Sequence, residues 1–183
     1  MARTLIVYAS REGQTGKIAG TIAKELESSG AEVFLLNAAV IKSFETFGIN
    51  GFDKVVLGAS LHAGYIEKEL VRFIDACKIA LQQKPCWFFL VLMAAATPDI
   101  AKREKDLQAA ESMVRKQVPM ALGPIEMIAG ALMYTCYNWF IKWTMKRISA
   151  KQGGATDTSR DHEYTDWEQV KDYAERIRQG TAG

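Results

Sequence analysis

The chain has 183 residues, of which 49% are hydrophobic, and its formal net charge is +2. This length and hydrophobic content suit one domain with a substantial core, and so nearly balanced a charge argues against a general nucleic-acid binder. The three cysteines, Cys77, Cys86 and Cys136, stand without metal-ligand spacing, which favours reduced thiols in a cytoplasmic protein and no metal site.

Apolar strands alternate with helices along the chain. Residues 4–9 form a β-branched run without the features of a signal peptide, and residues 14–29 repeat apolar side chains every four positions, as a helix does. The longest apolar run, residues 86–96, is too short to cross a membrane, so we expect no transmembrane segment. We expect further strands over residues 31–36, 53–60, 85–93 and 125–132, a helix or loop over 38–47, and helices over 66–82, 98–116 and 166–177, the last capped by Thr165 or Asp166.

Nearly all-apolar strands separated by helices indicate an α/β fold with a parallel sheet covered on both faces. We expect a flavodoxin-like, doubly wound, five-stranded sheet of order 2-1-3-4-5, in a single domain over residues 1–183. Ligands of such sheets bind beyond the carboxyl ends of the strands, so the loops after the first, third and fourth strands should converge on one site.

The loop after the first strand, SREGQT, predicts a phosphate site. A P-loop is excluded because Arg11 stands where its first glycine belongs and Ile18 where its hydroxyl belongs. A dinucleotide fingerprint is excluded because Gly13 and Gly16 lack the required spacing. The remaining readings are a loop that binds one phosphate monoester at a helix N-terminus, as in a mononucleotide, or an ordinary polar turn.

In the phosphate reading, hydroxyl groups and backbone N–H groups hold the anion. Ser10 and Thr15 would donate hydroxyl hydrogen bonds, Gly13 would let the backbone approach closely, and Glu12 must point outward because it repels a phosphate. The expected contacts are Ser10, Arg11, Glu12, Gly13, Gln14 and Thr15.

The other two loops could hold a flat ring. Gly58, Ser60 and Gly64 permit a tight loop after the third strand, and His62 could stabilise a reduced, anionic ring or assist proton movement, although a solvated histidine would look the same. Small residues after the fourth strand would let a ring lie close to the backbone, as would an ordinary packed turn. The expected contacts are Ser60, Leu61, His62, Ala63 and Gly64 in one loop and Met93, Ala94, Ala95 and Ala96 in the other.

An insertion over residues 133–165 separates the fifth strand from the last helix. Aromatic and basic side chains interleave in its first part, which suits a membrane interface or a large planar ligand; the alternative is that the aromatics pack the insertion onto the sheet. Its second part is a polar, turn-rich loop in which His162 is expected to be solvated. The candidate contacts are Tyr134, Tyr137, Trp139, Phe140, Lys142, Trp143, Lys146 and Arg147.

Hydrolytic chemistry is disfavoured because the chain has neither a G-x-S-x-G elbow nor an H-E-x-x-H motif. Without a nucleophile or a metal site, the chemistry belongs to a bound cofactor, and a mononucleotide in a flavodoxin-like sheet suggests FMN by analogy of fold.

Several stretches together resemble the flavodoxin-like, menaquinone-dependent protoporphyrinogen IX dehydrogenase (oxidase) family of bacterial haem synthesis. They are LIVYASREGQTGKIA, VVLGASLHAGY, IAGAL with the aromatic insertion, and GGATDTSRDHEYTDWEQV, the most specific of the four. The resemblance covers nearly the whole chain. It implies an FMN enzyme, cytoplasmic or peripheral on the inner face of the membrane, that oxidises a porphyrinogen and passes the electrons to menaquinone or another quinone.

Two stretches depart from the family pattern. After the third strand the family has Ser-Ile-Arg-Tyr-Gly and then a histidine, whereas this chain has Leu61, His62 and Ala63 within that motif and Glu67 after it. The MAAATPD stretch also lacks the basic residues expected after the fourth strand.

The alternative functions are an electron-carrier flavodoxin and an FMN-dependent quinone reductase with another donor. The slightly basic charge favours the enzyme over a carrier with an acidic face, and a homo-oligomer stays open.

Overall fold

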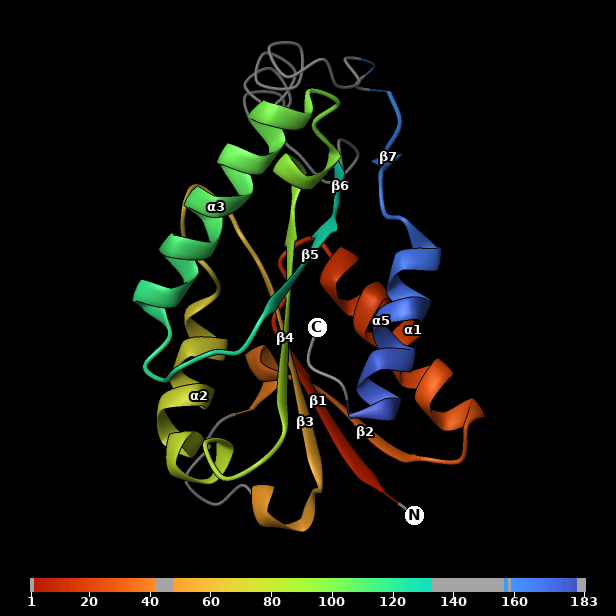
Figure 1. Cartoon of the computed structure of the whole chain (residues 1–183), viewed down its shortest axis with the longest axis vertical. Helices are drawn as coiled ribbons and strands as arrows, with labels where there is room; N and C mark the ends of the chain where they lie inside the picture. The colour runs from red at the N-terminus through yellow and green to blue at the C-terminus, as the bar shows by residue number, and fades with distance from the viewer. Residues whose placement is uncertain (1, 42–47, 133–156, 158, 181–183) are drawn as a thin grey trace.

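A computed structural model describes residues 2–41, 48–132, 157 and 159–180. Five strands form a parallel sheet of order β2-β1-β3-β4-β5, as the sequence predicts (Figure 1). The strands are β1 (Arg3–Tyr8), β2 (Glu32–Asn37), β3 (Lys54–Ser60), β4 (Cys86–Leu92) and β5 (Ile125–Ala129).

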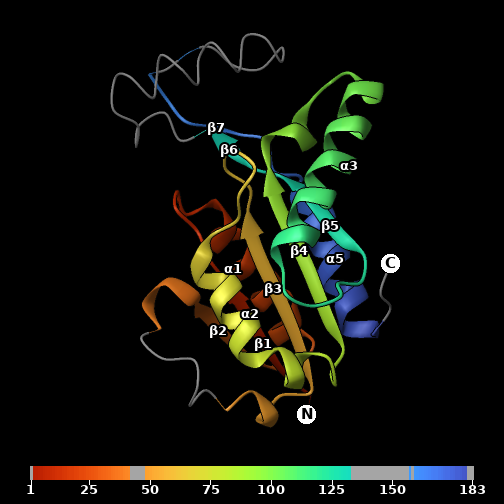
Figure 2. The ribbon, with the colours of Figure 1, turned by 90° about the vertical axis from the view of Figure 1, so that its left-hand side faces the viewer.

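Helices cover both faces of the sheet. Figures 1 and 2 show α1 (Gln14–Ser28) and α5 (Trp167–Gln179) on one face, and α2 (Lys68–Leu81) and α3 (Ile100–Gln117) on the other. Short 3₁₀ turns are η1 (Ala38–Val40), η2 (Ile49–Gly51) and η3 (Met93–Ala96). The stretch 38–47 therefore begins with a 3₁₀ turn, and its residues 42–47 lie outside the described part of the chain. Among the described residues, no helix is long and apolar enough to cross a membrane.

The two faces of the sheet bury two separate cores, and β4 shows how one strand serves both. Trp87, Phe89 and Val91 pack with the side chains of α1 and α5, whereas Phe88, Leu90 and Leu92 pack with those of α2. Successive side chains of a strand point to opposite faces, so a strand buried on both sides reads as a continuous apolar run.

The predicted fifth strand over residues 125–132 is divided at Gly130. Its end forms β6 (Ala131–Leu132), which leaves the parallel sheet and pairs antiparallel with β7 (His162–Glu163). The backbone N–H of Tyr164 donates to the carbonyl of Gly130 at 3.0 Å and extends this pairing. His162, expected to be solvated, is half-buried in β7, and its Nε2 lies 2.8 Å from the carbonyl oxygen of Asp157.

Asp166 caps α5, one of the two predicted caps. Its carboxylate accepts hydrogen bonds from the backbone N–H groups of Glu168 and Gln169 at 3.0 and 3.2 Å. An acidic side chain there satisfies backbone donors of the first turn and faces the positive end of the helix dipole. Thr165 instead donates to the carbonyl of Ala129 at 2.8 Å, which ties the start of α5 to the end of β5.

Candidate cofactor site

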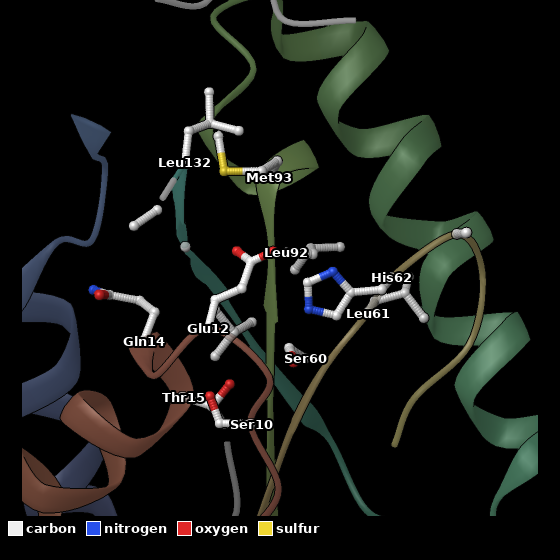
Figure 3. A pocket seen from close by; sticks show the side chains of 14 residues that line it. Ser10, Glu12, Gln14, Thr15, Ser60, Leu61, His62, Leu92, Met93 and Leu132 are labelled. Atoms are coloured by element: carbon white, nitrogen blue, oxygen red, sulfur yellow. The ribbon is translucent and has the colours of Figure 1, made fainter. Parts of the chain in front are cut away.

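A cavity of about 320 Å³ opens at the carboxyl edge of the sheet (Figure 3). The loops after β1, β3, β4 and β5 all contribute to it, which is the convergence expected of this fold. Its volume lies within the range of small-molecule sites. The lining residues are Ser10, Glu12, Gln14, Thr15, Ser60, Leu61, His62, Ala63, Val91, Leu92, Met93, Gly130, Ala131 and Leu132.

The first loop presents backbone donors at the bottom of this cavity. Gly13, with φ +91°, is the N-cap of α1, and its N–H donates to Ser10 Oγ at 2.9 Å. The next N–H groups, those of Gln14, Thr15 and Gly16, have no acceptor among the described residues, because the first helical bond runs from the Lys17 N–H to the Gly13 carbonyl. Such N–H groups at the positive end of a helix dipole suit an anion.

Gln14 contributes a buried acceptor without a donor. Its side chain is 4% exposed, and its Nε2 donates to Thr165 Oγ1 at 2.8 Å. Its Oε1 has no hydrogen-bond partner among the described residues. Because an unpartnered buried polar atom is costly, this oxygen is the kind of group that a bound molecule satisfies.

The direction of the Glu12 side chain differs from the one expected from the sequence. The sequence predicts that its side chain points outward, but it lines the cavity, and Figure 3 shows its carboxylate in the middle of the view, between the side chains of Gln14 and His62. The hydrogen bond from the Gly13 N–H to Ser10 Oγ closes the turn that contains Glu12, and Ser10 and Glu12 both line the cavity. A phosphate held by the first loop therefore has to lie nearer to Ser10 and Thr15.

The loop after β3 is built on a tight turn from His62 to Tyr65. The backbones of these two residues exchange hydrogen bonds of 2.8 and 3.0 Å, and Ala63 and Gly64 between them have φ values of +50° and +86°. Positive φ at both central positions is the pattern of a type I′ turn. Glycine adopts it readily, whereas Ala63 is held there at a cost of about 1 kcal/mol.

Other hydrogen bonds hold this loop in place against neighbouring elements. The N–H of Leu61 donates to the carbonyl of Val91 at 3.0 Å. The side chain of Gln117 in α3 donates to the carbonyl of Gly64 at 2.8 Å and accepts from the N–H of Ile66 at 3.2 Å. The loop is thus tied to β4 and α3, and His62 is presented from a well-supported turn.

Gly58 has a different role from the one its motif suggests. It lies within β3, where a Cβ atom would fall 2.2 Å from Cζ of Phe89 in the next strand. The glycine is therefore required for the packing of an aromatic ring in the core, and the tight loop depends on Ala63 and Gly64 instead.

Glu67 is a functional candidate to which the sequence analysis assigned no role. Its carboxylate is 5% exposed and accepts hydrogen bonds from the Oγ of Ser60 at 2.8 Å and from its N–H at 3.3 Å. Both His62 Nε2 and Arg11 Nε lie 3.9 Å from its Oε1. The sequence alone does not predict these contacts of Glu67, because they form only when the loop after β3 folds back on that strand.

The structure places some predicted residues elsewhere. Met93 lines the cavity, but Ala94, Ala95 and Ala96 do not, and neither do Arg11, Gly13 and Gly64. The predicted contacts Tyr134, Tyr137, Trp139, Phe140, Lys142, Trp143, Lys146 and Arg147 lie outside the described residues. The lining residues that the sequence did not predict are Val91, Leu92, Gly130, Ala131 and Leu132. The small residues around Gly130 could have indicated part of this wall.

Comparisons with known proteins identify the family. A flavodoxin domain model matches residues 5–159. Protoporphyrinogen IX dehydrogenase [quinone] of Escherichia coli K12 is 31% identical over 175 residues, covering 96% of this chain and 94% of that protein. A Leishmania major protein of the same name is 27% identical over 175 residues, covering 94% of this chain and 73% of its own length.

Solved structures agree on the fold. A flavodoxin from Streptococcus pneumoniae TIGR4 superposes with a TM-score of 0.56 at 15% identity, covering 98% of this chain and 100% of that one. The flavodoxin domain and the position of the cavity indicate a flavin cofactor. The chain belongs to the flavodoxin-like oxidoreductase family of the protoporphyrinogen IX dehydrogenases [quinone].

Proposed function

We propose that this chain is an FMN-dependent dehydrogenase that oxidises protoporphyrinogen IX to protoporphyrin IX, with menaquinone or another respiratory quinone as electron acceptor. The observation that carries this proposal is the similarity, over 96% of the chain, to a protein named for that reaction. The cavity supports it, because hydroxyl groups at the start of α1 and apolar side chains after β4 and β5 line it together, as suits a flavin mononucleotide.

The cavity divides into two regions that suit the two ends of FMN. The N–H groups of Gln14 and Thr15, with the hydroxyls of Ser10 and Thr15, would hold the phosphate at the start of α1. The His62 turn on one side and Met93 and Leu132 on the other would enclose the flat ring (Figure 3). Bound FMN would supply the redox chemistry, taking up hydrogen from the donor and passing the electrons on to the quinone.

The phosphate assignment can be tested with riboflavin, which has the ring of FMN but lacks the phosphate. Fluorescence titration of the cofactor-free protein should give a dissociation constant for riboflavin at least tenfold higher than for FMN, since hydrogen bonds to charged groups contribute about 1.5–3 kcal/mol each. Equal affinities would mean that the first loop does not hold the phosphate.

Residues 134–151 are proposed to serve the quinone and porphyrinogen side of the reaction. Their sequence interleaves aromatic and basic side chains, which suit a planar, carboxylate-bearing substrate or the membrane surface where quinones dissolve. A peripheral contact with the inner face of the membrane is therefore part of the proposal.

Deleting residues 134–151 separates this role from cofactor binding. We expect the deletion variant to bind FMN with wild-type affinity, because the described residues that line the cavity are all retained, and to lose quinone-linked turnover. Turnover equal to that of the full chain would contradict the assignment of the segment. Loss of FMN binding would show that the segment is needed for the site itself.

A further inference from the structure

Glu12 lines the cofactor cavity, but the proposed function gives its side chain no role. Its carboxylate has no hydrogen bond or ion pair within the part of the chain that the structure describes. The basic side chains of the two adjoining loops, Arg11 and His62, each lie 3.9 Å from Glu67 instead. A ligand that fills the cavity takes water away from the Glu12 carboxylate, so it binds well only if it brings hydrogen-bond donors of its own.

Gln14 supplies a second acceptor from the same loop. The Thr165 hydroxyl donates to the carbonyl of Ala129 at 2.8 Å, so its oxygen is free to accept the 2.8 Å hydrogen bond from the amide nitrogen of Gln14. The amide oxygen of Gln14 is then the atom left without a partner among the described residues, in a side chain that is 4% exposed. Two side chains of the first loop therefore need donors that a ligand can supply.

The chemistry of the cavity changes from one end to the other (Figure 3). The hydroxyls of Ser10 and Thr15, with the backbone N–H groups at the start of α1, offer donors at the end proposed for the phosphate. Met93 and Leu132 make the opposite end apolar, as suits a flat ring. The Glu12 carboxylate lies between these two ends. The part of the ligand that joins phosphate to ring therefore passes an acceptor, and in FMN that part is a chain of carbons that carry hydroxyl groups.

We propose that Glu12 is a specificity-determining residue for the cofactor, whose carboxylate accepts hydrogen bonds from the hydroxyl groups of the chain between phosphate and ring. The inference rests on the proposed function for the choice of a flavin mononucleotide. It explains why an acidic side chain stands in a loop that holds a phosphate, since the carboxylate contacts the next part of the molecule rather than the phosphate itself. Because a carboxylate offers only acceptors, it favours a ligand with hydroxyl groups over one without them.

Two flavins that lack the phosphate isolate this contact. Riboflavin carries the hydroxyl-bearing chain, whereas lumiflavin has a methyl group in its place, and neither has a phosphate for the carboxylate to repel. In fluorescence titrations of the cofactor-free protein, Glu12→Met should raise the dissociation constant of riboflavin about tenfold, because the side chain keeps its approximate length but loses its acceptors. The dissociation constant of lumiflavin should stay unchanged. Glu27→Met, the same change at an exposed position of α1, is the matched control and should alter neither value.

The pair of ligands separates a contact with the chain from a general effect on the site. Unchanged riboflavin affinity in Glu12→Met would overturn the inference, and so would an equal loss for riboflavin and lumiflavin, which would place the effect on the ring or on the folding of the loop. If the selective loss is seen but the FMN-loaded wild type forms no porphyrin from protoporphyrinogen IX, the proposed function alone is wrong. A wild-type chain that binds no flavin would overturn both.

Discussion

Replacing Gly58 by alanine would drive a methyl group into the ring of Phe89. A Cβ atom at this position would lie 2.2, 2.5 and 2.9 Å from three ring carbons. Carbon atoms in contact are normally about 3.5–4.0 Å apart, so the ring would have to retreat by more than about 1 Å. It is fully buried and packs edge-on against Tyr173 of α5, with ring centroids 6.4 Å apart, so its retreat would disturb the packing of that helix.

Overpacking of this kind costs typically 1–3 kcal/mol, and the preference of strands for alanine over glycine offsets about 0.5–1 kcal/mol. Because the buried Phe89 ring is packed against its neighbours and cannot move aside freely, we expect Gly58→Ala to lower the free energy of unfolding by about 2 kcal/mol. For a chain of this length, that corresponds to a melting temperature roughly 4–8 °C lower.

Urea unfolding followed by circular dichroism measures this loss, and two further variants sharpen it. Gly20→Ala, in α1, introduces a Cβ that meets nothing within 4 Å and should stabilise the protein by up to about 1 kcal/mol. Combining Gly58→Ala with Phe89→Leu removes the ring that clashes, so the double variant should be more stable than the sum of the single changes predicts. A Gly58→Ala protein as stable as the wild type, or strict additivity of the pair, would refute the reasoning.

Three further predictions concern the cofactor loop, the β6–β7 pair and the Cys86 thiol. Thr15→Val should weaken FMN binding about tenfold or more in a fluorescence titration, because it removes a hydroxyl from the proposed phosphate site; unaltered affinity would place the phosphate elsewhere. Partial burial acts to raise the pKa of Glu163, but hydrogen bonds from Trp167, Gln14 and Lys17 outweigh it and hold the pKa below the usual value. Its ionised form therefore adds stability above the pKa of the unfolded chain and loses it as the pH falls through the folded pKa. Glu163→Gln should accordingly be less stable than the wild type in urea at pH 7 by up to about 1 kcal/mol and equal to it near pH 3, whereas the same difference at both pH values would contradict this. Burial raises the pKa of the Cys86 thiol to about 12, so in a Cys136→Ser variant we expect iodoacetamide at pH 8 to label Cys86 only after unfolding, with peptide mass distinguishing Cys86 from Cys77; rapid labelling of Cys86 in the native protein would be the contrary result.

The sheet could be predicted from the sequence because its strands are buried on both faces. The run in β4 supplies side chains to both cores, and such runs separated by amphipathic helices leave few arrangements. The same topology predicts that Ser10, Thr15, Ser60, His62 and Met93 meet at one cavity, and they do. Local chemistry also predicted Asp166 as a cap, since the cap depends only on residues two and three positions ahead.

Features that depend on contacts between distant residues could not be predicted. The strand over residues 125–132 breaks at Gly130 because β6 pairs with β7, about 30 residues later in the chain. Gln14 is buried through a bond to Thr165, 151 positions away. Glu67 contacts Ser60 only because the intervening loop reverses direction through Ala63, a residue type that does not by itself signal positive φ.

The central claim is tested most directly by an anaerobic assay of the purified, FMN-loaded chain with protoporphyrinogen IX and a menaquinone analogue. Porphyrin fluorescence should rise well above that of a sample without protein. It should stay far lower when the quinone is left out, because each bound FMN accepts only two of the six electrons that a porphyrinogen loses on becoming a porphyrin. If FMN binds and can be reduced chemically, yet porphyrin forms no faster than in the control, the dehydrogenase account is wrong, and an electron carrier or a quinone reductase with another donor takes its place.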